Sequence, residues 1–148
     1  IIMTSDQIRS EIIGCEKKIA NARGRIRDLE EDQYELERLA MKIRNLQSEF
    51  EARQDQRKRK LSAVLALTEV KSAARYYEGM SGLLNSREFV RADNALTDDV
   101  SAIRGKQREI EDEVEELKRQ ISALETRIAN LRVSLQEACL REAAAAEA

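Results

Sequence analysis

The chain has 148 residues, the length of about one domain. It contains no proline, tryptophan or histidine, 3% of its residues are aromatic and 36% are charged. The absence of proline permits long uninterrupted helices, the scarcity of aromatic residues argues against a compact globular core, and the absence of histidine excludes a Cys/His zinc site. The net charge of −2 gives no electrostatic reason to expect nucleic acid or an acidic membrane as partner.

The first predicted helix covers residues of about 4–75. Thr4 and Gln7 have the spacing of a capping box, so we expect the helix to start there, just after Met3, the expected native first residue. Apolar residues then alternate at spacings of four and three, which predicts one narrow buried stripe. Leu39 and Leu46 widen this stripe on one side. Its members are Ile8, Ile12, Cys15, Ile19, Ala22, Ile26, Leu29, Leu36, Ile43 and Phe50.

Two of the five glycines, Gly79 and Gly82, predict a chain reversal at about 76–86. Either glycine can take the left-handed conformation that ends a helix. Asn85 and Glu88 have capping-box spacing, and Ser86 is a competing cap, so a second helix is expected to start here and to cover about 87–141. Residues 143–148 form a low-complexity tail outside the predicted domain, which covers 3–142.

The second predicted helix carries the clearest heptad pattern in the chain, broken only by the polar Gln107. We expect a buried stripe along its whole length. The apolar residues of this stripe are Leu96, Val100, Ile103, Ile110, Val114, Leu117, Ile121, Leu124, Ile128, Leu131 and Leu135.

These elements predict an all-α fold, an antiparallel two-helix coiled-coil hairpin whose N-terminal helix is the longer. A turn centred near residue 83 pairs residues whose numbers sum to about 166. The stretch 51–60, which contains the basic run 57–60, then lies nearly opposite the acidic run 109–116, with Gln107 facing the basic run. Ile8, Ile12 and Ile19 extend beyond the second helix, so they are expected to need a second chain.

No residues form a recognisable catalytic, cofactor-binding or metal site, and we expect the protein not to be an enzyme. The expected register separates Cys15 from Cys139 too far for an intrachain disulfide, which leaves free thiols or an intermolecular bridge. Glutamines at stripe positions are expected to fix register: Gln33, Gln47, Gln54 and Gln107. No apolar run approaches the roughly 18 residues of a membrane span, so no direct membrane insertion is expected.

Two short motifs flank the expected reversal. The first is Tyr77-Glu78-Gly79, an aromatic-x-Gly triplet at the turn itself. The second places Phe89 and Asp93 four residues apart, on one face of the second helix. In isolation, the second motif is more simply explained as an apolar residue that starts the stripe and an acid favoured near a helix N-terminus.

With these motifs, the chain resembles the small helical-hairpin proteins of bacterial type VII secretion, whose two helices meet at a W-x-G turn. It is most similar to the longer relatives encoded beside LXG toxins, which act as targeting factors or chaperones. The resemblance places Tyr77 and Gly79 at the W-x-G positions, with tyrosine in place of tryptophan, and makes Phe89 and Asp93 an F-x-x-x-D export motif.

The resemblance implies an adaptor whose partner is the helical N-terminal domain of a toxin, another small helical hairpin, or both. It implies a cytoplasmic protein, with co-export through the secretion system as the alternative. A structural coiled-coil homodimer that acts as spacer or scaffold is the competing interpretation, and nucleic acid is not an expected partner. The residues expected to contact the partner are Ile8, Ile12, Ile19, Leu36, Leu39, Ile43, Leu46 and Phe50.

Overall fold

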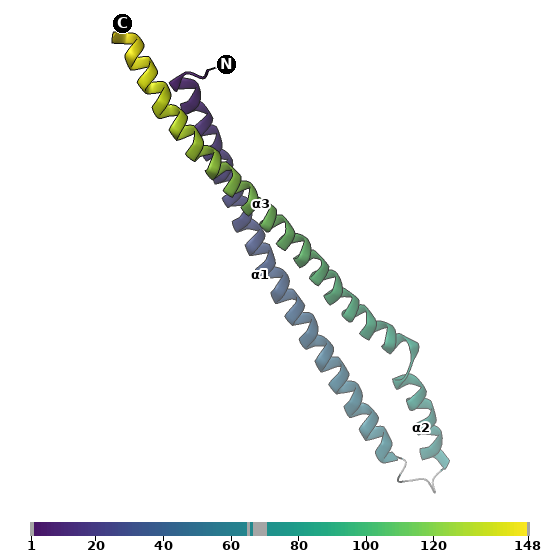
Figure 1. The fold of residues 1–148 in the computed structure, drawn as a ribbon. Coiled ribbons are helices and arrows are strands. Elements are labelled where there is room, and N and C mark those ends of the chain that lie inside the picture. Colours follow the sequence, from purple (N-terminus) through teal and green to yellow (C-terminus); the bar gives the residue numbers. More distant parts are fainter. Residues whose placement is uncertain (1, 65, 67–70, 148) are drawn as a thin grey trace. The chain divides into compact units, whose positions relative to one another are not determined.

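The computed structural model describes residues 2–64, 66 and 71–147, which form an all-α fold without strands in these ranges. The helices are α1 (Ser5–Val64), α2 (Lys71–Leu84) and α3 (Arg87–Glu147), with 60, 14 and 61 residues (Figure 1). The expected all-α helical hairpin is confirmed. Its N-terminal helix is not the longer arm, because the returning arm comprises both α2 and α3.

The chain divides into two compact units. The terminal unit consists of Ile1–Gln33 and Arg108–Ala148, so it contains about the first half of α1 and the last two thirds of α3. The central unit is Tyr34–Gln107 and contains the rest of α1, all of α2 and the start of α3.

The terminal unit is held together by a narrow apolar core between the two antiparallel helix segments. Residues at four-three spacing on each helix bury against one another, and Met3, Ile121, Leu124 and Leu135 pack around them. Ion pairs lie on both sides of this core: Arg25–Glu113 at 3.1 Å, and Arg23–Glu125 at 3.0 Å. The core residues are Ile8, Ile12, Cys15, Ile19, Ile128, Leu131 and Ala138.

Hydrogen bonds fix the end of the terminal unit at which α1 begins and α3 ends. The Thr4 amide donates to Gln7 Oε1 at 3.0 Å and the Gln7 amide donates to Thr4 Oγ1 at 3.3 Å, which confirms the predicted capping box. The amide and hydroxyl of Ser5 donate to the two carboxylate oxygens of Glu142 at 3.0 and 2.6 Å. These bonds lower the pKa of Glu142 and join the first turn of α1 to the last turns of α3. Helix α3 continues through the exposed low-complexity tail to Glu147.

The expected overhang of Ile8, Ile12 and Ile19 is wrong. These side chains are 2%, 9% and 6% exposed and pack in the core against α3. The error lies in the expected register. A turn near residue 83 would place Glu11 beyond the end of the second helix, whereas in the structure Glu11 forms an ion pair with Arg127 on α3 at 2.9 Å. Because α1 ends at Val64, well before residue 75, α3 extends along α1 as far as Ser5.

The central unit joins α1 to α2 and α3 through apolar contacts and one buried amide. Phe50 on α1 stacks on Phe89 on α3, with ring centroids 4.7 Å apart. Gln54 is 5% exposed, and its side-chain amide donates to the backbone carbonyl of Leu84. This carbonyl is one of those left without an intrahelical partner at the end of α2, so Gln54 fastens that end to α1.

The predicted turn at Tyr77–Gly79 is wrong, because both residues lie inside α2. No described glycine has a positive φ. A glycine inside a helix costs only about 1 kcal/mol of stability, so Gly79 does not have to end the helix. One face of α2 carries the half-buried Tyr77 and Met80 and the buried Leu84 at helical spacing, and this apolar face favours the helix. The chain instead bends between α2 and α3, where the Ser86 carbonyl accepts the first hydrogen bond of α3 from the Val90 amide. Predicted helix at 65 and 67–70 lies outside the described residues.

The predicted contact between the two charged runs is also wrong. Glu113 of the acidic run pairs with Arg25 in the terminal unit. Lys58 of the basic run belongs to the central unit, where its ammonium lies 5.9 Å from the centroid of the Phe89 ring. Gln107 does not face the basic run either, since its amide donates to Glu37 at 3.1 Å. Both errors follow from the misplaced reversal.

We expect Ile8→Ala to lower the free energy of unfolding by about 2–5 kcal/mol, since the change leaves a cavity in the core. Ile13→Ala is the matched control: this residue lies on the same helix but is 52% exposed, so its change should stay within about 0.5 kcal/mol. Urea denaturation followed by circular dichroism measures both. Equal effects would contradict the burial of Ile8 against α3.

Candidate partner-binding site

An apolar groove runs along one side of the contact between α1 and α3 in the central unit. We define the apolar groove by the residues that line it, which enclose about 500 Å³: Leu46, Glu49, Phe50, Arg53, Ala92, Ala95 and Leu96. Leu46 is 58% exposed, and Leu39, two turns away on the same face of α1, is 47% exposed. These are large apolar side chains that the fold leaves in solvent.

Small side chains on α3 keep the groove open. Ala92 and Ala95 line the groove together with Leu46, and their methyl side chains are too small to cover the leucine side chain. A helix with apolar residues at core positions and also at one flanking position has a stripe wide enough to contact two neighbours. Because Leu39 and Leu46 extend the α1 stripe on this side only, the stripe is wider here than the contact with α3 covers.

The other flank of the same helix contact is polar. Glu37 on α1 accepts hydrogen bonds from the Arg104 guanidinium and from the Gln107 amide on α3. These donors stabilise the carboxylate and lower the pKa of Glu37 to about 2. The two flanks therefore differ in chemistry, with paired charge on one side and uncovered leucine on the other.

Phe89 and Asp93, the proposed export motif, both take part in the contact between α3 and α1. Phe89 is half-buried by its stacking on Phe50, and Asp93 Oδ1 accepts from the Gln47 side-chain amide at 3.2 Å. The same amide donates to Thr97 Oγ1 at 2.8 Å. Gln47, expected to fix register, thus connects α1 to two successive turns of α3.

A second carboxyl lies close to Asp93. The hydrogen bond with Asp93 and its negative charge raise the pKa of Glu51, because ionising both groups at short range is unfavourable. Ionised Glu51 therefore lowers the stability of the fold at neutral pH, because its charged form is disfavoured in the folded state. Sequence analysis missed this pair, as it missed Glu37–Arg104, because both depend on the true register.

The predicted contact residues divide into three groups by exposure. Ile8, Ile12 and Ile19 are buried in the terminal unit, so they are not free to bind a partner. The remaining residues lie in the central unit, where Leu39 and Leu46 are exposed and three others are half-buried: Leu36, Ile43 and Phe50. Tyr77 and Gly79 lie on α2 and do not line the groove.

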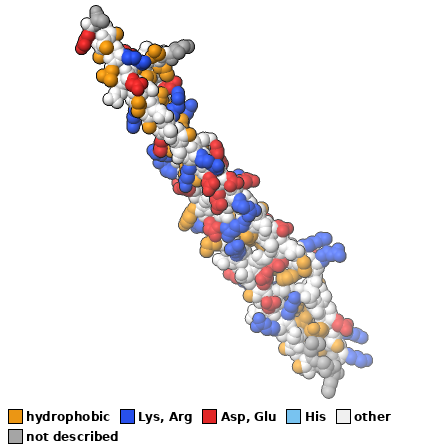
Figure 2. Space-filling model, in the orientation of Figure 1, with side chains coloured by type: hydrophobic (Ala, Val, Ile, Leu, Met, Phe, Trp, Pro, Cys, Tyr) orange, Lys and Arg blue, Asp and Glu red, His pale blue; other side chains and the backbone are white. Residues whose placement is uncertain are grey.

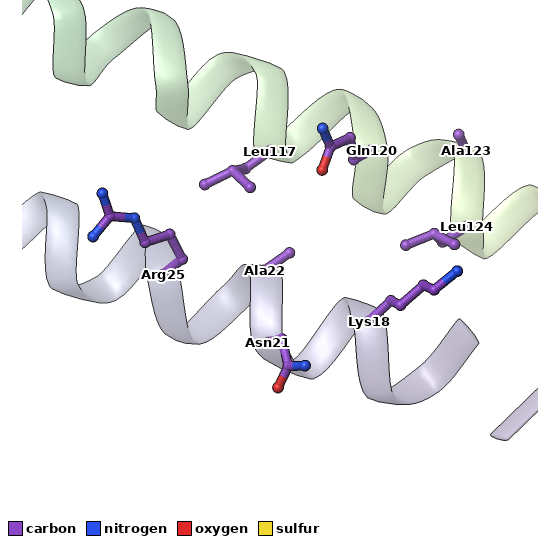
Figure 3. Close-up of a pocket in the computed structure, with 8 residues that line it drawn as sticks. All are labelled: Lys18, Asn21, Ala22, Arg25, Leu117, Gln120, Ala123 and Leu124. Carbon is purple, nitrogen blue, oxygen red and sulfur yellow. The ribbon is translucent and has the colours of Figure 1, made fainter. Parts of the chain in front are cut away.

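The terminal unit has a groove of its own, of about 580 Å³, with a different rim. Figure 3 shows Leu117 and Leu124 on α3 pointing toward Ala22 on α1, with the long polar side chains of Lys18 and Arg25 beside them. Charged side chains occupy here the positions that leucines occupy in the central unit, and Arg25 is held by Glu113. This second groove is therefore a poorer apolar docking surface.

Acidic and basic side chains are interspersed along the face seen in Figure 2 rather than separated by sign. Among the described residues, no cluster of acidic or cysteine side chains could hold a metal ion, and both cysteines are free thiols. None of the described helices has a stretch apolar and long enough to cross a membrane.

No protein-family model, curated protein or solved structure matches the chain.

The Glu37–Arg104–Gln107 cluster predicts a pH-dependent loss of stability. A depressed pKa means that ionised Glu37 stabilises the fold above the ordinary value of 4.5, and this contribution is lost as the pH falls toward about 2. We expect Glu37→Gln to lower the melting temperature at pH 7 and to have no effect near pH 2. Thermal denaturation at a series of pH values measures this.

The control is Glu111→Gln, because Glu111 is exposed and forms no ion pair among the described residues. The same loss from Glu111→Gln, or a Glu37→Gln effect independent of pH, would contradict a role for the ionised Glu37 carboxylate.

Proposed function

We propose that this protein is a non-enzymatic adaptor that binds a helical segment of another protein. The observation that carries this proposal is the apolar groove, with Leu39 and Leu46 exposed beside it. A partner helix laid there would bury these leucines and complete a three-helix or larger bundle, the usual way in which a widened apolar stripe is covered. The paired charges on the opposite flank favour this side as the docking face.

A more specific form of the proposal names the partner and the pathway. The partner is the helical N-terminal domain of an LXG-type toxin, and the adaptor acts in the bacterial cytoplasm as a targeting factor or chaperone for type VII secretion, with co-export as the alternative outcome. The hairpin architecture and the Phe89/Asp93 pair support this form. Tyr77–Gly79 does not, because it lies inside α2 and not at a turn.

Leu46→Lys should weaken binding of such a toxin domain by tenfold or more, because it places a charge where an apolar side chain must be buried. Burial of a leucine is worth about 1.5–3 kcal/mol, and about 1.4 kcal/mol corresponds to tenfold in affinity. Titration calorimetry with the helical N-terminal domain of a toxin encoded beside this chain measures the change.

Met41→Lys is the matched control, since Met41 lies on the same helix, is 55% exposed and does not line the groove. It should bind like the unchanged protein. No binding of the toxin domain by the unchanged protein would overturn the specific form of the proposal, and equal losses in both variants would overturn the groove as the docking site.

Asp93→Asn separates an export signal from a structural role. Asparagine keeps an oxygen that can accept from Gln47, and it removes the negative charge beside Glu51. We therefore expect the melting temperature at pH 7 to stay the same or rise, while export by a type VII system falls. Normal export of this variant from secreting cells would show that Asp93 is only structural.

A further inference from the structure

The charges around the apolar groove are arranged in a self-complementary way. Leu46 lies between Lys42, one turn toward the N-terminus, and Glu49, about one turn toward the C-terminus. Glu49 and Arg53 line the groove itself. Within residues 2–64, 66 and 71–147, the structure forms no ion pair with Lys42, Glu49 or Arg53, whereas Glu37 on the opposite flank is paired with Arg104.

This arrangement fits a second copy of the same chain. In a twofold-symmetric dimer each contact occurs twice, so that residue i of one copy meets residue j of the other and the reverse. If two α1 helices cross antiparallel at Leu46, then Lys42 of each copy faces Glu49 of the other. A parallel arrangement would instead place like charges together, which is unfavourable.

We propose that a second copy of this chain docks in the apolar groove, antiparallel, with Leu46 packed on Leu46 of the second copy. The helices of the two central units then form a bundle in which the exposed leucines are covered. The two Lys42–Glu49 pairs set the direction and register of this contact, while leucine burial supplies most of the affinity.

The proposal goes beyond the adaptor function and does not depend on it. It states what covers the groove when no partner is present. If the adaptor function also holds, self-association and partner binding use one surface, and partner binding has to displace the second copy.

The test is the mass of the full chain in solution, measured by sedimentation equilibrium over a wide range of concentration without any partner. We expect a mass of twice 16.9 kDa. Leu46→Lys should raise the dissociation constant by about tenfold or more, and Met41→Lys should leave it unchanged. Circular dichroism checks that each variant keeps its helix content.

Charge exchange tests the direction. Lys42→Glu and Glu49→Lys should each weaken the dimer, because either change brings like charges together, and the double variant should restore it. Mass twice 16.9 kDa together with this restoration supports the proposal. A monomer at every concentration, or a double variant as weak as the single ones, overturns it. Neither outcome bears on toxin binding, which is measured separately.

Discussion

Burial of a stripe only one or two side chains wide is the constraint on which this structure depends. In each unit, core residues of α1 at four-three spacing pack against residues with the same spacing on an antiparallel helix. Such a contact covers little of each helix, so the positions that flank it decide what else the helix can bind. Polar residues within it set the register, as Gln54 does by holding the Leu84 carbonyl.

The sequence was sufficient to predict what depends on local pattern. The long helices follow from heptad spacing and the absence of proline, and the Thr4–Gln7 capping box follows from side-chain chemistry within one turn. Leu39 and Leu46 could be recognised as a widening of the stripe, and both are exposed. These features need no knowledge of where the chain reverses.

The register could not be predicted, because it depends on where the chain reverses. Gly79 and Gly82 indicated a turn, yet the cost of two helical glycines is outweighed by the apolar face of α2 that packs on α1. This one misplacement shifted the whole pairing. It made Ile8 seem unpaired and hid the Glu37–Arg104 and Glu51–Asp93 pairs, since a long-range pair can be identified only when both partners are in register.

The contrast between the two units shows how one repeating pattern supports both a closed and an open surface. Along α1, one series of flanking positions seven residues apart begins with polar side chains and then turns apolar. It runs Glu11, Lys18, Arg25, Asp32, Leu39, Leu46. In the terminal unit two members pair with α3, Glu11 with Arg127 and Arg25 with Glu113.

In the central unit Leu46 of this series lines a groove with Ala92 and Ala95, and Leu39 and Leu46 are both exposed. Solvent-exposed ion pairs add little to affinity, whereas an uncovered leucine pair beside a groove offers about 25 cal/mol for each Å² that a partner removes from water. A partner that binds here, as proposed, would therefore gain most from burying Leu39 and Leu46.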